Sequence, residues 1–278
     1  MYKPALYTAA NGLQRSDAHD ITEEYAKEIG HMSGRCLDIG SGPGDVVNDF
    51  ILPKLHPKAT VLCSDISESM LNFGKSKYRD NKRLSFIKLD IESSDLPKDL
   101  IEHFDHVVSY NCLHWCQNMR KAFENIFTLL RPGGSTLLVF LANNPGFKAY
   151  ETLAAMPRYQ PYMKDVDRYI PLFQHTEQRR ETLKSLVQDE GFEVLHCSRR
   201  ERSYIFDTPE TLTKFMLAVN PFIERMPVDL RSEYVKDLVA EAVKETIIFN
   251  KSNSNENKYS MLSRYYIFVL YLRKPIAK

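Results

Sequence analysis

The chain has 278 residues, which is enough for one large domain or for one domain with a lid. Its hydrophobic fraction of 43% and charged fraction of 26% are typical of a soluble globular protein, and its net charge of +1 argues against a nucleic-acid partner. No apolar run approaches the roughly 20 residues of a membrane-spanning helix, and the N-terminus shows no secretory signal. The five cysteines, an odd number, favour reduced thiols in a cytoplasmic protein over a disulfide framework.

Helix and strand patterns alternate over the first half of the chain. A helix is predicted over 16–29, because Ile21, Tyr25 and Ile29 share one face and Ser16 is a suitable N-cap. Strands that alternate with helices indicate a parallel, doubly wound sheet. The further predicted elements are strand 35–39, helix 44–55, strand 60–64, a helix after Ser67 to Tyr78, strands 84–89 and 105–109, helix 118–130 and strand 135–141.

The pattern changes after Ala142. Residues 143–175 are rich in aromatic side chains, prolines and glycines. Arg199, Arg200 and Arg202 form the only dense basic cluster, which we interpret as a solvated strand exit, with a phosphate-binding patch as the alternative. The elements predicted here are helix 179–190, strands 192–197 and 203–206, helices 208–218 and 229–248, a polar loop over 252–258 and a last strand that begins near Ser260.

These patterns predict one domain over 1–278, made of a sheet core and added segments. In open α/β sheets, ligands bind outside the carboxyl ends of the strands, and segments that follow strands project toward that edge. The added segments therefore predict a helical substrate cap, and their aromatic content favours this role over mere surface cover. The core is expected to span about 33–142, 176–198 and 260–273, and the cap about 1–30, 143–175 and 199–250.

A glycine-rich turn follows the first predicted strand, within the sequence CLDIGSGPGDV of residues 36–46. Gly40, Gly42 and Gly44 let the backbone turn tightly and approach a ligand without an intervening Cβ. Their spacing is G-x-G-x-G, whereas dinucleotide enzymes use G-x-G-x-x-G to bring a helix N-terminus onto a pyrophosphate. The turn therefore favours a nucleoside ligand without a pyrophosphate, such as S-adenosylmethionine.

Acidic residues follow the next two strands and suit the same ligand. Asp65 is expected to accept hydrogen bonds from the ribose hydroxyls, and Asp90 from the adenine amino group. Ile66 and Ile91 would then sandwich the adenine ring, while Asp38 fixes the loop or the amino-acid end of the ligand. Two alternatives remain at this point, namely a nicotinamide oxidoreductase and an α/β domain whose strand-end acids merely cap helices.

This arrangement resembles the class I S-adenosylmethionine-dependent methyltransferases. Segments 7–18, 110–118 and 218–230 further resemble the insect juvenile hormone acid O-methyltransferases, and this resemblance covers nearly the whole chain. It implies a mostly parallel seven-stranded sheet with helices on both faces. It also implies methyl transfer from S-adenosylmethionine, with S-adenosylhomocysteine as product, to the carboxylate of juvenile hormone acid or farnesoic acid. The alternatives are a methyltransferase of another small acid, such as trans-aconitate, and a non-catalytic binder of hydrophobic ligands.

The resemblance also implies that Gln14 and Trp115 hold the substrate carboxylate, and His114 is a weaker candidate for the same task. A carboxylate is ionised at neutral pH and needs no general base, so the enzyme only has to place it in line with the methyl group. Uncharged donors such as an amide and an indole N–H suit this task. The alternatives are that Gln14 is an exposed polar residue, Trp115 a wall of the core and His114 a packing residue.

The remaining expectations concern the cofactor's sulfonium, the substrate chain and metals. Tyr7 and Tyr110 are placed to face the sulfonium through their rings. Cys112, His114 and Cys116 lack a fourth ligand, so no metal site is expected. The expected partner is a small sesquiterpenoid acid, bound by a monomer or a homodimer. Candidate residues for the apolar slot are Phe147, Tyr150 and the other aromatics up to residue 173, together with Phe215, Met216, Val219, Asn220, Phe222 and Ile223.

Overall fold

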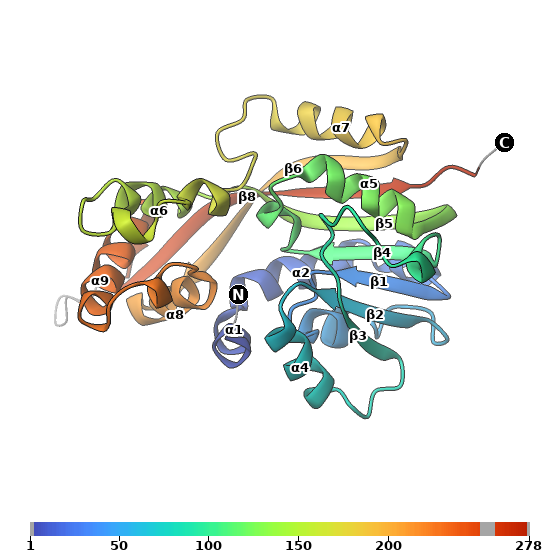
Figure 1. Cartoon of the computed structure of the whole chain (residues 1–278), viewed down its shortest axis with the longest axis horizontal. Helices are drawn as coiled ribbons and strands as arrows, with labels where there is room; N and C mark the ends of the chain where they lie inside the picture. The colour runs from blue at the N-terminus through green and yellow to red at the C-terminus, as the bar shows by residue number, and fades with distance from the viewer. Residues whose placement is uncertain (1–2, 251–258, 277–278) are drawn as a thin grey trace.

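The computed structural model describes residues 3–250 and 259–276 and shows a twisted sheet flanked by helices, with a group of helices at one end (Figure 1). Within the described residues, the sheet has eight strands in the order β3-β2-β1-β4-β5-β8-β6, and β7 pairs with β8. The predicted α/β fold is therefore confirmed. The loop predicted at 252–258 lies outside the described residues.

The first five strands are parallel and close to their predicted positions. Because β1 has β2 on one side and β4 on the other, the chain order reverses next to β1. Such a switch point leaves a crevice at the carboxyl ends of the strands, where ligands bind in this class of sheet. These strands are β1 (Arg35–Ile39), β2 (Thr60–Asp65), β3 (Leu84–Lys88), β4 (Phe104–Tyr110) and β5 (Leu130–Asn143).

The last three strands are antiparallel and differ from the prediction. The two strands predicted at 192–197 and 203–206 are one strand, β6 (Glu193–Phe206), paired along its length with β8 (Ser260–Arg273). The predicted helix 229–248 ends earlier, as α9 (Val228–Lys244), and Thr246–Phe249 forms β7. The β-branched residues at 246–248 favour a strand there.

The N-terminal helix was predicted with a wrong start and without its break. Ser16 lies inside α2 (Gly12–Glu24), and α3 (Ala26–His31) follows a break at Tyr25. A further helix, α1 (Pro4–Ala10), precedes them and has a proline in its first turn, where no backbone N–H is needed.

The other predicted helices are present, although the one predicted at 44–55 is reduced to a π-helical turn over Val47–Ile51. Asn118 caps α5 and Thr208 caps α8 through their side chains. The remaining α-helices are α4 (Glu68–Lys77), α5 (Met119–Leu129), α6 (Phe147–Ala154), α7 (Arg179–Asp189) and α8 (Pro209–Val219). Short 3₁₀ turns occupy Lys98–Leu100, Leu113–Trp115, Gln160–Tyr162, Val166–Tyr169 and Ile223–Arg225.

Two apolar cores cover the two faces of the sheet. One contains residues of α5 and α7 and the facing strand residues. The other runs from α2 and α3 through the π-helical turn into α6, α8 and α9. Figure 1 shows β6 and β8 reaching beyond the parallel strands toward this last group of helices. Among the described residues, no helix is long and apolar enough to cross a membrane.

A buried ion pair ties α2 to the two long strands. Asp17 of α2 is fully buried, accepts a hydrogen bond from Arg202 Nε of β6 at 2.7 Å and accepts from the Tyr265 hydroxyl of β8 at 3.0 Å. Arg200 pairs with Glu24 of the same helix at the surface. Two of the three arginines of the basic cluster, Arg200 and Arg202, therefore bind acids of this chain.

We expect Arg202→Met to lower the free energy of unfolding by about 3 kcal/mol, because it leaves the Asp17 carboxylate buried without its partner. Arg200→Met is the matched control, since it removes an exposed ion pair between the same two elements and should cost no more than about 1 kcal/mol. Urea denaturation measures both values. Equal losses in the two variants would contradict a special role for the buried pair.

Candidate functional site

The site begins at the glycine-rich turn after β1. Gly40 and Gly42 have φ angles of +68° and +55°, which L side chains rarely adopt. A Cβ at Gly40 would collide with the Cys112 side chain, and a Cβ at Gly42 would come within 3.8 Å of the Tyr7 ring. The turn therefore needs glycine at both positions for its backbone angles, and at Gly40 also for space.

Asp65, at the end of β2, holds this turn in place. Its two carboxylate oxygens accept the N–H groups of Gly42 at 2.8 Å and Ser67 at 2.7 Å. Leu89 N–H donates to the Asp65 carbonyl, which brings the end of β3 and the exposed Asp90 next to it. The Asp90 side chain accepts the Glu92 N–H at 2.9 Å.

The two isoleucines predicted to sandwich an adenine differ in exposure. Ile66 is 62% exposed, which is unusual for a large apolar side chain, whereas Ile91 is 6% exposed and belongs to a packed core. Ile66 therefore offers a free apolar face beside Asp65, whereas Ile91 packs within the core.

A polar cavity of about 310 Å³, counted to its open mouth, lies between the turn and α2. Asp38 lines it and is almost fully buried, so burial and the neighbouring Asp65 and Asp45 carboxylates raise the pKa of Asp38 well above its usual range. A cationic ligand would offset this cost of ionisation. The α-ammonium group of S-adenosylmethionine is such a cation, so the residues present fit that ligand. The residues that line this polar cavity are Tyr7, Gln14, Asp38, Gly40, Ser41, Asp45, Val46, Tyr110 and Asn111.

Asp45, which the sequence analysis missed, joins the N-terminal helices to the turn. Its carboxylate accepts Asn11 Nδ2 at 2.9 Å and Arg15 Nη1 at 2.8 Å. Arg15 also pairs with Asp49 at 2.8 Å. The position directly after the last glycine of the turn was the available signal, but its partners are distant in sequence.

Tyr7 and Tyr110 both line the polar cavity. The Tyr110 hydroxyl hydrogen-bonds with the Thr22 hydroxyl at 3.1 Å, and burial raises the pKa of Tyr110 above its usual range. Burial and the charges of Asp45 and Asp65 do the same for the pKa of Tyr7. Both phenols therefore remain protonated, and they are uncharged walls of the cavity rather than bases.

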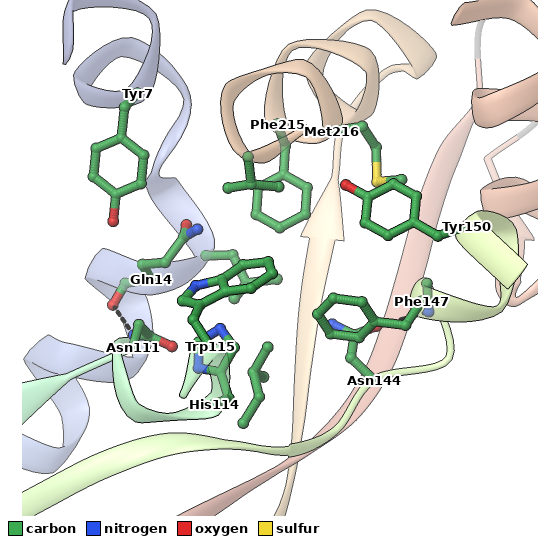
Figure 2. Close-up of a pocket in the computed structure, with 14 residues that line it drawn as sticks. Tyr7, Gln14, Asn111, His114, Trp115, Asn144, Phe147, Tyr150, Phe215 and Met216 are labelled. Atoms are coloured by element: carbon green, nitrogen blue, oxygen red, sulfur yellow. Dashed lines mark hydrogen bonds between the residues drawn. The ribbon is translucent and has the colours of Figure 1, made fainter. Parts of the chain in front are cut away.

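A second, apolar cavity adjoins the first and has a volume of about 590 Å³ counted to its open mouth. Figure 2 shows Tyr7, Gln14, Asn111, His114 and Trp115 on one side of it and Phe147 and Tyr150 on the other. Tyr7, Gln14 and Asn111 line both cavities, so the two spaces meet at these residues. The full lining is Tyr7, Leu13, Gln14, Asn111, His114, Trp115, Leu141, Asn144, Gly146, Phe147, Tyr150, Phe215, Met216 and Val219.

Unpaired polar groups gather near this junction. Gln14 Oε1 and His114 Nδ1 are buried and have no hydrogen-bond partner in the described part of the chain. Burial lowers the pKa of His114 to about 3, so its ring is neutral at physiological pH. Trp115 packs against His114, with 4.8 Å between ring centroids. Buried polar atoms without partners are costly in a folded protein, and a bound ligand would satisfy them.

Asn111 is a further site residue that the sequence analysis missed. It follows β4 with a φ angle of +53°, donates to the Gln14 carbonyl at 3.5 Å and lines both cavities. Asparagine tolerates this backbone conformation better than most residues, and its place after a strand was the available signal. Strain of this kind often marks functional positions.

Several of the expected slot residues lie outside the cavity lining, namely Asn220, Phe222, Ile223 and the aromatics Tyr159, Tyr162, Tyr169 and Phe173. Phe222 is fully buried and packs edge-on against Tyr150 and Tyr169. Asn220 Oδ1 accepts the N–H groups of Phe222 and Ile223, so Asn220 organises the turn after α8. Phe147, Tyr150, Phe215, Met216 and Val219 do line the cavity.

The lining also limits the chemistry of the site. Neither cavity has a lysine or arginine among its described lining residues. Over residues 3–250 and 259–276, no group of three or more His, Cys, Asp or Glu side chains is placed to hold a metal ion. The five cysteines are free thiols, and burial raises the pKa of Cys112 well above its usual range. Uncharged donors and apolar walls thus dominate the inner cavity.

A parallel sheet with a glycine turn after β1 and acids at the strand ends defines the class I S-adenosylmethionine-dependent methyltransferases. A model of the methyltransferase domain matches residues 37–136. The fold is similar to Haemonchus contortus phosphoethanolamine N-methyltransferase 2, solved in complex with phosphomonomethylethanolamine and S-adenosylhomocysteine. The TM-score is 0.51 at 19% identity, over 92% of this chain and 53% of that one. The protein is an enzyme that uses S-adenosylmethionine as its methyl donor.

Two curated relatives define the family more closely. The chain is 34% identical to juvenile hormone acid O-methyltransferase of Drosophila melanogaster, over 99% of this chain and 93% of the relative. It is 33% identical to juvenile hormone acid O-methyltransferase of Bombyx mori, over 97% of this chain and 96% of the relative. The chain belongs to the juvenile hormone acid O-methyltransferase family.

The protonation state of the His114 ring can be tested directly by NMR. We expect its ring resonances to stay at neutral-imidazole positions from about pH 8 to about pH 5, since an ordinary histidine titrates near about 6.5. Below about pH 6.5 the unfolded chain takes up a proton at His114, whereas the folded chain does not. His114 therefore lowers the free energy of unfolding as the pH falls from about 6.5 to about 5. A His114→Gln variant assigns the resonance. Titration of the folded protein near 6.5 would contradict the burial described here.

Proposed function

We propose that this enzyme methylates the carboxylate of juvenile hormone acid or farnesoic acid to give the methyl ester. The observation that carries this proposal is the junction of the two cavities. A polar space suited to the donor meets an apolar space suited to a long hydrocarbon chain, and uncharged hydrogen-bond donors stand where they meet. The substrate class follows that of the curated relatives, whose name specifies juvenile hormone acid.

The uncharged lining suits transfer to a carboxylate. S-adenosylmethionine supplies the methyl group as a sulfonium cation. The carboxylate, with an ordinary pKa near about 4, is ionised before it binds and needs no base. Because opposite charges are lost as the ester forms, a dry site favours the reaction, whereas an arginine clamp would hold the carboxylate but weaken its attack. The absence of lysine and arginine among the described lining residues agrees with this chemistry.

Three side chains would hold the carboxylate in line with the methyl group. Gln14 offers its amide N–H, Trp115 its indole N–H and His114, kept neutral by burial, one ring N–H. The unpaired His114 Nδ1 supports this assignment, because it can carry the ring proton and donate it to a carboxylate, whereas the unpaired Gln14 Oε1 only accepts hydrogen bonds and would need a donor. The sequence indicated His114 only as a weaker candidate for holding the carboxylate. Its buried, unpaired Nδ1 strengthens the case for that role.

On the donor side, Asp38 would bind the ammonium group, Asp65 the ribose and Asp90 the adenine amino group, with Ile66 against the ring. Support comes from the burial of Asp38 at the polar cavity and from the position of Asp65 and Asp90 at adjacent strand ends. Ile91 would support the ring from the core side. Tyr7 and Tyr110 would line the sulfonium.

We further infer that the enzyme works in the cytoplasm on a small sesquiterpenoid acid, as a monomer or homodimer. Five free thiols, four of them buried, suit a reducing compartment.

We expect Gln14→Ala and Trp115→Phe each to lower kcat/KM for farnesoic acid by about 10- to 100-fold, because each removes one hydrogen bond to a charged group. Trp115→Phe should still bind S-adenosylmethionine with unchanged affinity by titration calorimetry, because Trp115 lines the inner cavity and not the polar one. Tyr159→Phe is a suitable control, since its hydroxyl bonds to Asp237 outside both cavities. Full activity in both variants would refute the carboxylate clamp.

A further inference from the structure

One hydroxyl group stands at the apolar end of the inner cavity. Tyr150 of α6 is 2% exposed and lines the cavity together with Phe147, Phe215 and Met216. Figure 2 shows it on the side opposite Tyr7 and Gln14, with its hydroxyl directed into the cavity. A polar group at this place requires an explanation, because Phe147, Phe215, Met216 and Val219 offer the cavity only hydrocarbon and thioether.

The orientation of Asn220 decides what this hydroxyl can do. Asn220 Oδ1 accepts the N–H groups of Phe222 and Ile223, both at 2.9 Å, which fixes the amide with its NH₂ group on the other side. That NH₂ group donates to the Tyr234 hydroxyl at 3.0 Å and also hydrogen-bonds the Tyr150 hydroxyl. Tyr150 thus receives a hydrogen bond from Asn220, and its own proton remains to be donated.

No hydrogen bond from the Tyr150 hydroxyl to an acceptor is found in the described part of the chain. Phe147, Phe215 and Val219 have no polar side-chain atoms, and the Met216 sulfur is a weak acceptor. Burial raises the pKa of Tyr150 far above its usual range, so the hydroxyl keeps its proton. No cation is available among the lining residues to balance an anionic group there. The Tyr150 hydroxyl therefore presents a neutral donor to the ligand at this end of the cavity.

We propose that Tyr150 donates a hydrogen bond to an ether or epoxide oxygen at the end of the substrate remote from its carboxylate, and that Asn220 positions Tyr150 for this task. The inference rests on the proposed function and extends it to substrate choice. Juvenile hormone acid carries such an epoxide and farnesoic acid does not. With farnesoic acid the hydroxyl remains unpaired, and an unpaired buried donor disfavours that complex.

The test compares farnesoic acid with its terminal epoxide as substrates of the wild-type enzyme and of Tyr150→Phe. The ratio of kcat/KM for the epoxide acid to that for farnesoic acid should fall about 3- to 10-fold in the variant, which corresponds to one uncharged hydrogen bond. Tyr234→Phe is the matched control, because it removes the other hydroxyl that Asn220 binds but does not line the cavity. Its ratio should equal that of the wild type.

A second measurement uses the wild-type enzyme alone, in case Tyr150→Phe fails to fold. The methyl ester of the epoxide acid should inhibit methyl transfer about 3- to 10-fold more strongly than methyl farnesoate. An unchanged ratio in Tyr150→Phe, an equal loss for both acids, or equal inhibition by the two esters would overturn the assignment. A wild-type enzyme that methylates neither acid would instead overturn the proposed function, and this inference with it.

Discussion

The buried carboxylate of Asp45 holds the two halves of the site together. It accepts hydrogen bonds from Asn11 and Arg15, at the start of α2, while its own backbone follows the glycine turn. Charge-assisted bonds of this kind are short and directional. They fix the N-terminal helices against the donor cavity and so place Tyr7 and Gln14 where the two cavities meet. The buried Asp17–Arg202 pair secures the other side of α2 to the long strands.

The two cavities differ in the charge that they can stabilise. Acidic side chains line the space suited to the sulfonium donor, and uncharged donors and aromatic rings line the space suited to the acid. A reaction that joins an anion to a cation gains from this separation, because the carboxylate meets no strong opposing charge from the protein that would have to be released. Neutral His114 follows the same logic, since a charged imidazolium would bind the carboxylate more strongly but hold back its attack.

The glycine turn and the strand-end acids could be placed from the sequence, because both are local signals. The long strand β6 could not be predicted from the sequence. Its arginines have the pattern of a solvent-exposed strand end, and only the structure shows that they bind Asp17 and Glu24. Asp45 could not be recognised because its partners lie about thirty residues away in the sequence. Asn111 could not be recognised because its positive φ angle leaves no pattern in the sequence. The sequence predicted Asn220 as a slot residue, whereas the structure shows that its side chain organises the turn after α8.

The central claim is that the apolar cavity delivers a long-chain acid to the methyl donor. A radiolabelled methyl-transfer assay of the wild-type enzyme with farnesoic acid, juvenile hormone acid and a short dicarboxylic acid tests it most directly. The account predicts label in a base-labile ester of the farnesoid acids and little in the short acid. Label in the short acid alone would contradict the long-chain slot, and no label in any product, with S-adenosylmethionine binding intact, would contradict methyl transfer to these acids.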